Sequence, residues 1–171
     1  EEDVDEVETG GMDTEEASIR EVTSENSSYK ISGMLMAVYT NNPFYRVDPE
    51  TGDTVRENDD GEYETEDGDV VEEPGHRLAL SGVLDDGTGN IRVVFFGEQA
   101  RQILGIDEET EKEGDLQAVE EAGEEAVGNE LEVEGRTRYN DYFGRIEVLA
   151  NSVGEVETRK QLKDLLEVME V

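Results

Sequence analysis

A mainly β fold, a five-stranded Greek-key barrel, is predicted by three features of the sequence. Two apolar runs, 77–84 and 91–96, flank a polar turn at 85–90. The Asp-Gly and Gly-Asn pairs in that turn tolerate the positive φ angles that hairpin turns require. Three further segments have the alternation or the β-branched and aromatic content of strands: 29–39, 130–138 and 144–153. In chain order, a helical pattern separates the third of the five strands, 91–96, from the fourth, 130–138.

The first expected strand, 29–39, contains Gly33 as a candidate bend or bulge. Residues 40–75 then form an insert rich in Asp, Glu, Gly and Thr. Turn signals at 48–52 and 66–69 interrupt this insert. We expect the segments between these turns to pair as a small hairpin: 54–56 and 62–65.

Helical patterns follow the central hairpin. Residues 98–104 are expected to form a short helix with Ala100, Ile103 and Leu104 inward and Gly105 as its stop. Residues 115–127 are the second helical segment, capped by Asp115. Its inward face is expected to hold four residues: Leu116, Val119, Ala122 and Ala126. Residues 157–171 are amphipathic and predict a terminal helix.

Five strands with a helix between the third and the fourth is the order of the oligonucleotide-binding (OB) fold, a partly open Greek-key barrel. We therefore expect three regions. Residues 1–27 form an acidic flexible segment in which 18–22 can dock, residues 28–154 form the barrel with its insert at 40–75, and residues 155–171 form the C-terminal helix.

The chain is strongly acidic, with 47 Asp and Glu against 14 Lys and Arg and a net charge of −33. Proteins that bind phosphates usually have the opposite balance. The acids are concentrated in tails and loops: residues 1–27 carry a net charge of −10, whereas 76–106 are neutral. The acidity fits either a disordered chain or a folded protein adapted to concentrated salt. We favour the second, because at molar salt the Debye length is only about 3 Å and distant carboxylates barely repel DNA.

Several classes of protein and site are disfavoured. The chain has no Cys, so it forms no disulfide and no thiolate metal site. No apolar run is long enough to cross a membrane, and no signal peptide is evident, so we expect a cytoplasmic protein. The start at Glu1 indicates a trimmed chain. Neither a P-loop nor a nucleophile paired with the lone His76 is present, so we expect no enzyme and no cofactor.

Aromatic residues near strand ends are the candidate binding residues. Phe95 and Phe96 must point to opposite faces of one strand, because side chains alternate. We expect Phe95 in the core and favour a position on the open sheet face for Phe96, where a ring can stack on bases. Tyr139, Tyr142 and Phe143 crowd around the turn before the last strand. We expect one of these three in the core and one in contact with DNA.

Three segments carry a family resemblance. They are Asn42 to Tyr45 (NPFY), Leu80 to Glu98 (LSGVLDDGTGNIRVVFFGE) and Arg136 to Glu147 (RTRYNDYFGRIE). Over roughly residues 28–154 the chain resembles the OB-fold domains of archaeal replication protein A, the single-stranded DNA-binding protein of replication, repair and recombination. The acidic composition favours a haloarchaeal source.

The resemblance implies roles for particular residues. In that family, one aromatic near the end of the third strand and one in the loop between the fourth and fifth strands stack on bases. Matched by position, these are Phe96 and Phe143, with Tyr142 and Tyr139 beside the second. The expected phosphate contacts are arginines, which bind phosphate bidentately and stack on bases: Arg92, Arg136, Arg138 and Arg145. Each of these arginines could instead only solvate a sheet edge.

The insert departs from the family pattern. Related domains often carry a zinc ribbon there, with Cys-x-x-Cys pairs. This chain has Asp48-Pro49-Glu50-Thr51-Gly52 and Thr65-Glu66-Asp67-Gly68 at the corresponding places. Carboxylates and Thr cannot build a tetrahedral thiolate site. We therefore expect a degenerate, metal-free remnant of the ribbon, and regard a weak divalent-ion site among its Asp residues as the minor alternative.

The C-terminal helix has two interpretations. In replication protein A subunits such a helix joins a bundle with sister subunits, which makes other subunits or OB domains the expected protein partners. Alternatively, it closes its own barrel. The partner-binding stripe is predicted from the spacing: Leu162, Leu165, Leu166 and Met169.

Two functional classes remain from the sequence. The leading one is sequence-tolerant binding of single-stranded DNA by base stacking. The alternative is an assembly or scaffold module of a replication protein A complex with little DNA binding of its own. RNA binding by the same face is not separable from DNA binding, because no feature of the sequence reads a 2′-hydroxyl.

Overall fold

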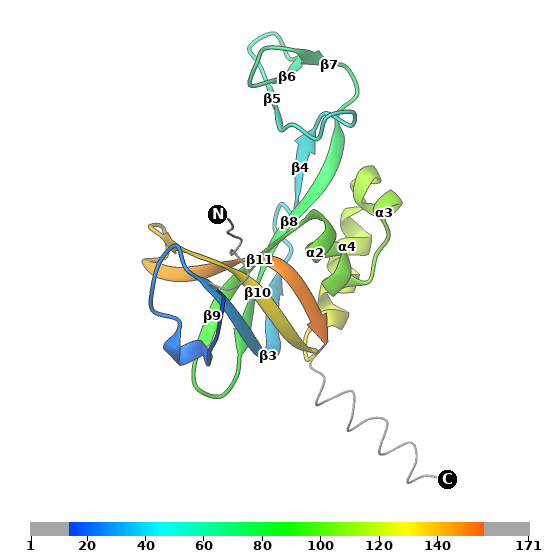
Figure 1. The fold of residues 1–171 in the computed structure, drawn as a ribbon. Helices are drawn as coiled ribbons and strands as arrows, with labels where there is room; N and C mark the ends of the chain where they lie inside the picture. Colours follow the sequence, from blue (N-terminus) through cyan, green and yellow to red (C-terminus); the bar gives the residue numbers. More distant parts are fainter. Residues whose placement is uncertain (1–13, 156–171) are drawn as a thin grey trace, which may run out of the picture. The chain divides into compact units, whose positions relative to one another are not determined.

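The computed structural model describes residues 14–155, which fall into two compact units (Figure 1). Within this range, unit 1 comprises residues 14–38, 81–94 and 126–155, and unit 2 comprises residues 39–80 and 95–125. The mainly β class is confirmed. The predicted C-terminal helix and its stripe, Leu162, Leu165, Leu166 and Met169, lie outside the described residues.

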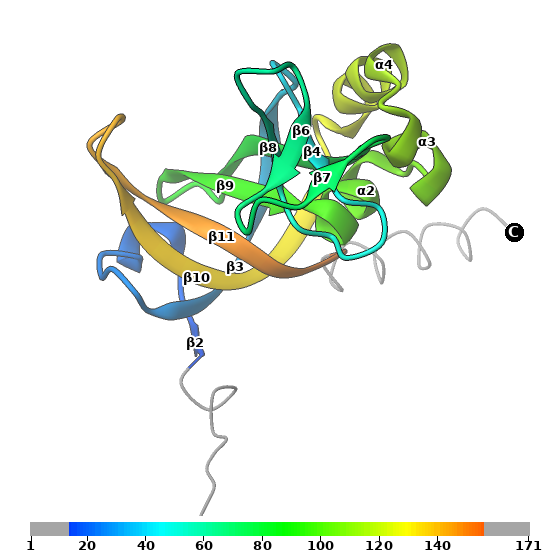
Figure 2. The same cartoon turned by 90° about the horizontal axis from the view of Figure 1, so that it is seen from above.

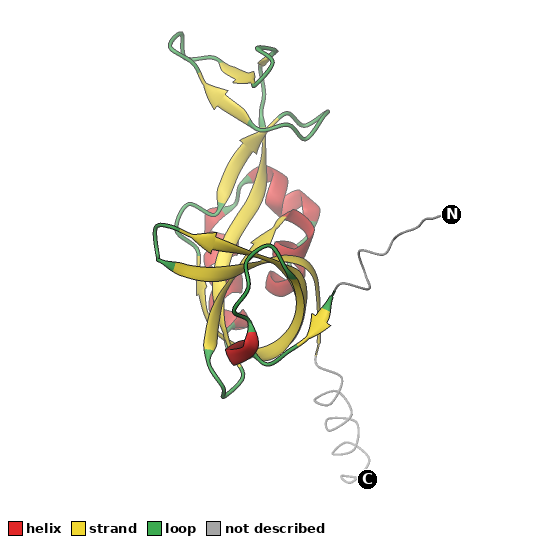
Figure 3. Cartoon of the chain, turned by 60° about the vertical axis from the view of Figure 1, so that its left-hand side comes forward, coloured by secondary structure: helices red, strands yellow, loops and turns green. Residues whose placement is uncertain are grey.

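Five long strands supply the main sheet: β3 (Ser28–Tyr39), β8 (Gly75–Asp85), β9 (Asn90–Phe96), β10 (Glu130–Asn140) and β11 (Arg145–Glu155). Two short strands, β2 (Glu15–Glu16) and β4 (Phe44–Val47), lie at the ends of this sheet. The strand order is β2-β3-β10-β11-β9-β8-β4, and an additional β3–β8 pairing closes the ring of strands (Figure 3). β11 runs parallel to β9 and antiparallel to β10. This is the connectivity of an OB barrel. The two short strands, β2 and β4, were not predicted from the sequence.

Alternation along β10 shows how the core of unit 1 is filled. Leu131, Val133, Gly135 and Thr137 are buried, whereas the residues that alternate with them are partly or fully exposed. The register shifts between Glu134 and Gly135, which marks a bulge. A Cβ at residue 135 would collide with the carbonyl oxygen of Leu149, so only glycine fits this close strand contact.

Gly33 allows two strands of the barrel to approach each other closely. A Cβ there would lie 2.9 Å from the Asp85 carbonyl oxygen, so the glycine lets β3 pass tightly by β8. The register of β3 with β10 is unbroken from Ser28 to Met34, so the bulge that we considered at Gly33 does not interrupt this pairing.

The segment before the barrel is partly built into unit 1. A short 3-10 helix, η1 (Ile19–Glu21), buries Ile19, and Val22 is buried beside it. The Ile19 N–H donates to Asp86 Oδ2 (2.8 Å) and the Arg20 N–H donates to Thr88 Oγ1 (3.1 Å). β2 (Glu15–Glu16) also pairs with β3. The docking of 18–22 is therefore observed, whereas the predicted flexible segment extended too far, because residues 14–27 have defined contacts.

Asp86 makes this docking dependent on pH. Burial by itself would raise the pKa of Asp86, but hydrogen bonds from the Thr88 hydroxyl and from the N–H groups of Ile19, Thr88 and Gly89 together lower it below its ordinary value. A carboxylate with a lowered folded pKa stabilises the fold above its unfolded pKa, about 4 for Asp. That contribution is lost as the pH falls through the lower folded value.

We therefore expect Asp86→Asn to lower the free energy of unfolding at neutral pH, since the amide nitrogen cannot accept the Ile19 N–H. The difference from the unsubstituted protein should shrink as the pH falls below about 4. Urea unfolding of both proteins across this pH range measures it. A difference that stays constant down to the lowest pH would show that the Asp86 charge does not stabilise the docked segment.

Unit 2 contains three helices: α2 (Gly97–Leu104), α3 (Glu108–Glu113) and α4 (Leu116–Ala126). α2 agrees with the prediction, because Ala100, Ile103 and Leu104 are buried and Gly105 ends it at φ 69°. In α4 the cap is confirmed, because Asp115 Oδ1 accepts the Ala118 N–H (3.1 Å). Leu116, however, is exposed, so its predicted inward position is wrong. It is the first residue of α4.

Helix α3 was not predicted from the sequence, because its residues, EETEKE, have no apolar periodicity. Asp107 caps it by accepting the Thr110 N–H (2.8 Å). Glu111 anchors it: its buried carboxylate meets Arg101 Nε (2.9 Å) and accepts the Leu78 N–H (2.8 Å). One carboxylate therefore ties α3 to α2 and β8 within unit 2.

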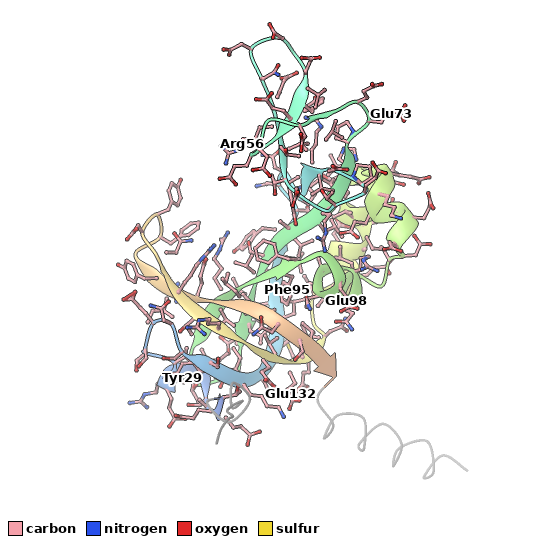
Figure 4. The ribbon with its side chains drawn as sticks, turned by 45° about the horizontal axis from the view of Figure 1, so that its top comes forward. Tyr29, Arg56, Glu73, Phe95, Glu98 and Glu132 are labelled. Carbon is pink, nitrogen blue, oxygen red and sulfur yellow. The ribbon has the colours of Figure 1, made fainter. Side chains whose placement is uncertain are left out.

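The insert contains four short strands: β4 (Phe44–Val47), β5 (Val55–Glu57), β6 (Tyr63–Thr65) and β7 (Val70–Val71). β5, β6 and β7 form their own three-stranded sheet, and β4 pairs with β8. The expected small hairpin is therefore present as β5–β6, and β7 extends it. Figure 4 labels Arg56 and Glu73 within this acidic insert.

The turns of the insert satisfy their backbone N–H groups with side-chain oxygens. Asp48 Oδ1 accepts the Glu50 N–H (2.9 Å), Asn58 Oδ1 accepts the Glu62 N–H (2.9 Å), and Thr65 Oγ1 accepts the Asp69 N–H (3.2 Å). Between residues 14 and 155 no group of three His, Cys, Asp or Glu side chains is placed to hold a metal ion.

We expect chelation to leave the insert unchanged, because side-chain oxygens already hold the turns that a metal would otherwise tie together. The thermal unfolding midpoint should be the same with EDTA, with added Zn²⁺ and with added Mg²⁺ at matched ionic strength. A midpoint that rises with one of these ions and saturates would contradict this expectation, since a ligand that binds only the folded state stabilises it by mass action.

Candidate functional site

The β10–β11 hairpin of unit 1 ends in a turn at residues 141–144 that carries the candidate aromatics (Figure 2). Asn140 fixes this turn from its first position. Its Oδ1 accepts the N–H groups of Tyr142 (2.9 Å) and Phe143 (3.2 Å), and its carbonyl accepts the Gly144 N–H (2.8 Å). Gly144 supplies the positive φ of 66° that closes the turn. The loop is therefore held in one backbone conformation by its own side chain.

The three aromatics around the turn are all exposed. Tyr142 is 88% exposed, Phe143 49% and Tyr139 46%. The rings of Tyr142 and Phe143 meet edge to face, with centroids 4.8 Å apart. The expectation that one of the three lies in the core is therefore wrong. The core of unit 1 is complete without them, because the turn lies past the last buried pair of the hairpin.

A buried carboxylate organises the arginines beneath the turn. Glu147 on β11 is 1% exposed and pairs in register with Arg138 on β10 and with Arg92 on β9. Its Oε2 accepts Arg138 Nε at 2.6 Å, and its Oε1 lies 3.4 Å from Arg92 Nε. Asn140 Nδ2 donates to Oε1 at 2.9 Å. A single acid thus fixes two guanidinium groups and the residue that holds the turn.

One of these arginines contacts an aromatic ring of the turn. The Arg92 guanidinium carbon lies 4.5 Å from the centroid of the Phe143 ring, a cation–π contact. Arg145 donates to the carbonyl and to the side-chain oxygen of Asn90, both at 3.3 Å. Strands β9 and β11 therefore both contribute to the position of the cations around the hairpin.

The charge of this surface is opposite to that of the chain. Around the turn, residues 90–96 and 136–147 carry four arginines, against one buried acid, Glu147, and one acid in the turn, Asp141. The remaining acids of β10 and β11 lie outside these two ranges. The acidic side chain of Glu147 is covered, whereas Arg92 and Arg138 retain 34% and 50% of their side-chain surface. A ligand at this surface therefore meets cations and ring faces in a protein whose net charge is −33.

Other predicted residues are placed as follows. Arg136 is exposed on β10, two residues before Arg138 and on the same side of the strand. Phe95 is fully buried, which confirms its core position (Figure 4). Phe96 is 39% exposed and belongs to unit 2, so it is described apart from the hairpin of unit 1.

Two site residues were not identified from the sequence: Glu147 and Asn140. Glu147 stands between Ile146 and Val148 in an apolar strand, and a lone acid in that setting indicates a paired, buried carboxylate. Asn140 was assigned only to a turn. Its several hydrogen bonds show that it links the turn to Glu147.

The arrangement can bind a ligand. It offers exposed rings for stacking and guanidinium groups for phosphate oxygens. Arg92, Arg138 and Asn140 are each paired with Glu147. Exposed rings can stack on any base, and guanidinium groups can bind backbone phosphates. The surface therefore favours ligands recognised by the flat faces of their bases and by their backbone rather than by sequence.

Comparison with known proteins agrees with the fold. The model of the replication factor-A C-terminal domain matches residues 28–165. The chain belongs to that family, and the expectation of a non-enzymatic protein is confirmed by it. No curated protein sequence matches the chain.

Two solved structures share the fold. One is described as a replication protein A heterotrimer bound to single-stranded DNA, with 18% identity and a TM-score of 0.70 over 92% of this chain and 40% of that one. The other is yeast RPA bound to single-stranded DNA, with 20% identity and a TM-score of 0.65 over 92% of this chain and 97% of that one. The chain thus spans less than half of the first relative and nearly all of the second. None of the helices between residues 14 and 155 is long and apolar enough to span a membrane.

Proposed function

We propose that this chain binds single-stranded DNA with little sequence preference, by stacking bases on exposed rings held above arginines. The observation that carries the proposal is the Phe143 ring over the Arg92 guanidinium, 4.5 Å apart, with Arg92 itself paired to the buried Glu147. Phe96 supplies a second ring, and Tyr142 and Tyr139 flank the first. Arg136, Arg138 and Arg145 are the further phosphate contacts.

The family and its relatives support this proposal. The matching family is a domain of replication factor A, and both similar structures are described as bound to single-stranded DNA. The same relationship supports our proposal of a role in replication, to which we add repair and recombination as part of the proposal. The arginines around the β10–β11 hairpin can attract phosphate, whereas the net negative charge of the whole chain would repel it.

Adaptation to concentrated salt would reconcile the net charge of the chain with DNA binding. We therefore also propose that the protein comes from an archaeon, and more narrowly from a haloarchaeon. Charges separated by more than about 3 Å are screened at molar salt, so the acidic insert would not repel the strand. Stacking is worth about 1–3 kcal/mol per base and does not rely on counterion release, so it persists under these conditions. The proposed site therefore uses the interaction that salt weakens least.

Competition binding tests the sequence tolerance. Labelled oligo-dT bound to the chain should be displaced by unlabelled mixed-sequence single strands at similar concentrations. The matched duplex should displace it only at far higher concentration, because its bases are not free to stack. Displacement by one base composition alone, or by duplex as well as by single strand, would contradict the proposal.

A second candidate is an assembly module of a replication protein A complex. It is favoured by the apolar stripe Leu162, Leu165, Leu166 and Met169 in the sequence after β11, and by the heterotrimer among the similar structures. Truncation after Glu155 tests it by sedimentation. Loss of assembly with a folded remainder supports the module, whereas loss of folding means that the segment completes its own barrel.

A further inference from the structure

Unit 2 contains an open pocket of about 1010 Å³, whose lining residues all belong to this unit. It is lined by the loop after β3, by β4 and β8, by the β5–β6 sheet and by the start of α4. Its volume lies near the upper end of the usual range for ligand pockets, about 300–1,000 Å³. A pocket of this size accepts a planar base together with its sugar and phosphate.

An arginine–tyrosine pair forms one wall of the pocket. The Arg46 guanidinium carbon on β4 lies 4.7 Å from the centroid of the Tyr63 ring on β6. Arg46 is exposed and Tyr63 is half-buried, so the ring supports a guanidinium whose surface is open to the pocket. A flat guanidinium on an aromatic ring offers a plane on which a base can stack, and the positive charge attracts phosphate.

The charge of the lining contrasts with that of the insert around it. Residues 48–73 contain thirteen acids and a single base, Arg56. Arg56 lines the pocket together with Arg46, and only Glu57 and Glu120 are acids in the lining. The pocket is therefore electrically balanced within the most acidic part of unit 2, because both arginines of β4 and β5 face it.

The rim of the pocket carries amide side chains on a fixed loop. Asn41 and Asn42 both line it. Asn42 has a φ of 48°, and the Pro43 carbonyl that follows accepts the Ala79 N–H at 2.7 Å, which ties the loop to β8. Amide groups present a donor and an acceptor side by side and pair with the edges of bases.

A further ring contact belongs to the pocket lining. His76 meets Phe44 edge to face, with centroids 5.7 Å apart, and its Nδ1 lies 3.2 Å from the Lys112 carbonyl. Gly114, at φ 68°, leaves room for this ring, since a Cβ there would lie 3.0 Å from it. This part of the lining is thus fixed by contacts within unit 2 and does not have to form when a ligand binds.

We infer that this pocket binds one nucleotide of a single strand, with the base stacked on the Arg46–Tyr63 pair and the phosphate at Arg56. The inference rests on the proposed function and adds to it a second nucleotide site, formed by the insert together with β8 and the start of α4 in unit 2. It assigns a binding role to a region that has no thiolate ligands for a metal.

Tryptophan reporters test the two sites separately, because the chain has no Trp. The Tyr63→Trp variant places a reporter in the pocket and the Phe143→Trp variant places one in the hairpin turn. The Val70→Trp variant is the matched control, on the same insert but outside the pocket lining. Each is titrated with oligo-dT of about 20 nucleotides, longer than the site of a typical OB fold, about 4–16 nucleotides.

We expect the emission of Tyr63→Trp to be quenched at saturation at least severalfold more than that of Val70→Trp. Adding Arg46→Ala to Tyr63→Trp should shift the titration to at least tenfold higher oligonucleotide concentration. Quenching in Phe143→Trp without quenching in Tyr63→Trp would overturn the pocket while leaving the proposed function standing. Quenching in Tyr63→Trp alone would support the pocket and count against the hairpin site. Quenching in neither variant would overturn the pocket and the proposed function together.

Discussion

Replacing Phe96 and Phe143 together by alanine is expected to weaken the binding of oligo-dT by about 2–4 kcal/mol, since each stacked base contributes about 1–3 kcal/mol. Phe143 is 49% exposed and Phe96 39% exposed, so their removal creates no large cavity. The loss should therefore appear in the dissociation constant and not in the stability. Fluorescence anisotropy with labelled oligo-dT measures the first, and urea unfolding measures the second.

The conservative change Phe143→Tyr is the matched control for this prediction, because it keeps a flat ring above Arg92. It should retain most of the affinity, whereas Phe143→Ala alone should lose about 1–3 kcal/mol. If the double alanine variant is folded and binds oligo-dT as tightly as the unsubstituted chain, neither ring stacks on bases. The arginines would then have to account for any binding.

Glu147→Gln is expected to destabilise the protein by about 1–3 kcal/mol, because it leaves Arg92 and Arg138 without the carboxylate that they share. Removing one partner of a fully buried pair costs about 3–5 kcal/mol. The value here is lower, because the arginine side chains are 34% and 50% exposed and water can replace part of the interaction. Urea unfolding at constant salt measures the loss.

Glu132→Gln provides the comparison for Glu147→Gln. Glu132 pairs with Lys30 at 3.5 Å, and both side chains are 39% exposed, so the same chemical change removes only a surface ion pair (Figure 4). Such pairs contribute about 0–1 kcal/mol. Equal effects of the two substitutions would show that Glu147 is not the anchor of the hairpin surface.

The barrel strands were predictable from the sequence because their signals are local. The turn at 85–90 and the alternation of 130–138 specify a hairpin and a half-buried strand without reference to the rest of the chain. Helix α3 was not predictable in this way. Its six residues contain no apolar position, and what holds it is the contact of Glu111 with Arg101 and Leu78, which are distant in the sequence.

The same distinction applies to the hairpin surface. Its exposed rings and arginines were identified from residue type and position. The role of Glu147 was not, because it depends on the parallel pairing of β11 with β9, which brings Arg92 opposite Glu147 across 55 residues of chain. The exposure of all three turn aromatics was also missed. Their exposure arises because the β10–β11 hairpin continues beyond its last buried residue pair. No local sequence pattern indicates how far the hairpin continues.

The most direct test of the central claim is the anisotropy of labelled oligo-dT and of a matched duplex from about 0.5 to 3 M KCl, a range of strong screening. We expect tight binding of the single strand only. The slope of log affinity against log salt should be no steeper than about −3, since four arginines contribute about 0.7 each on a single strand. Absence of binding at every salt concentration in a folded sample, or equal binding of duplex, would contradict single-strand stacking and favour the assembly module.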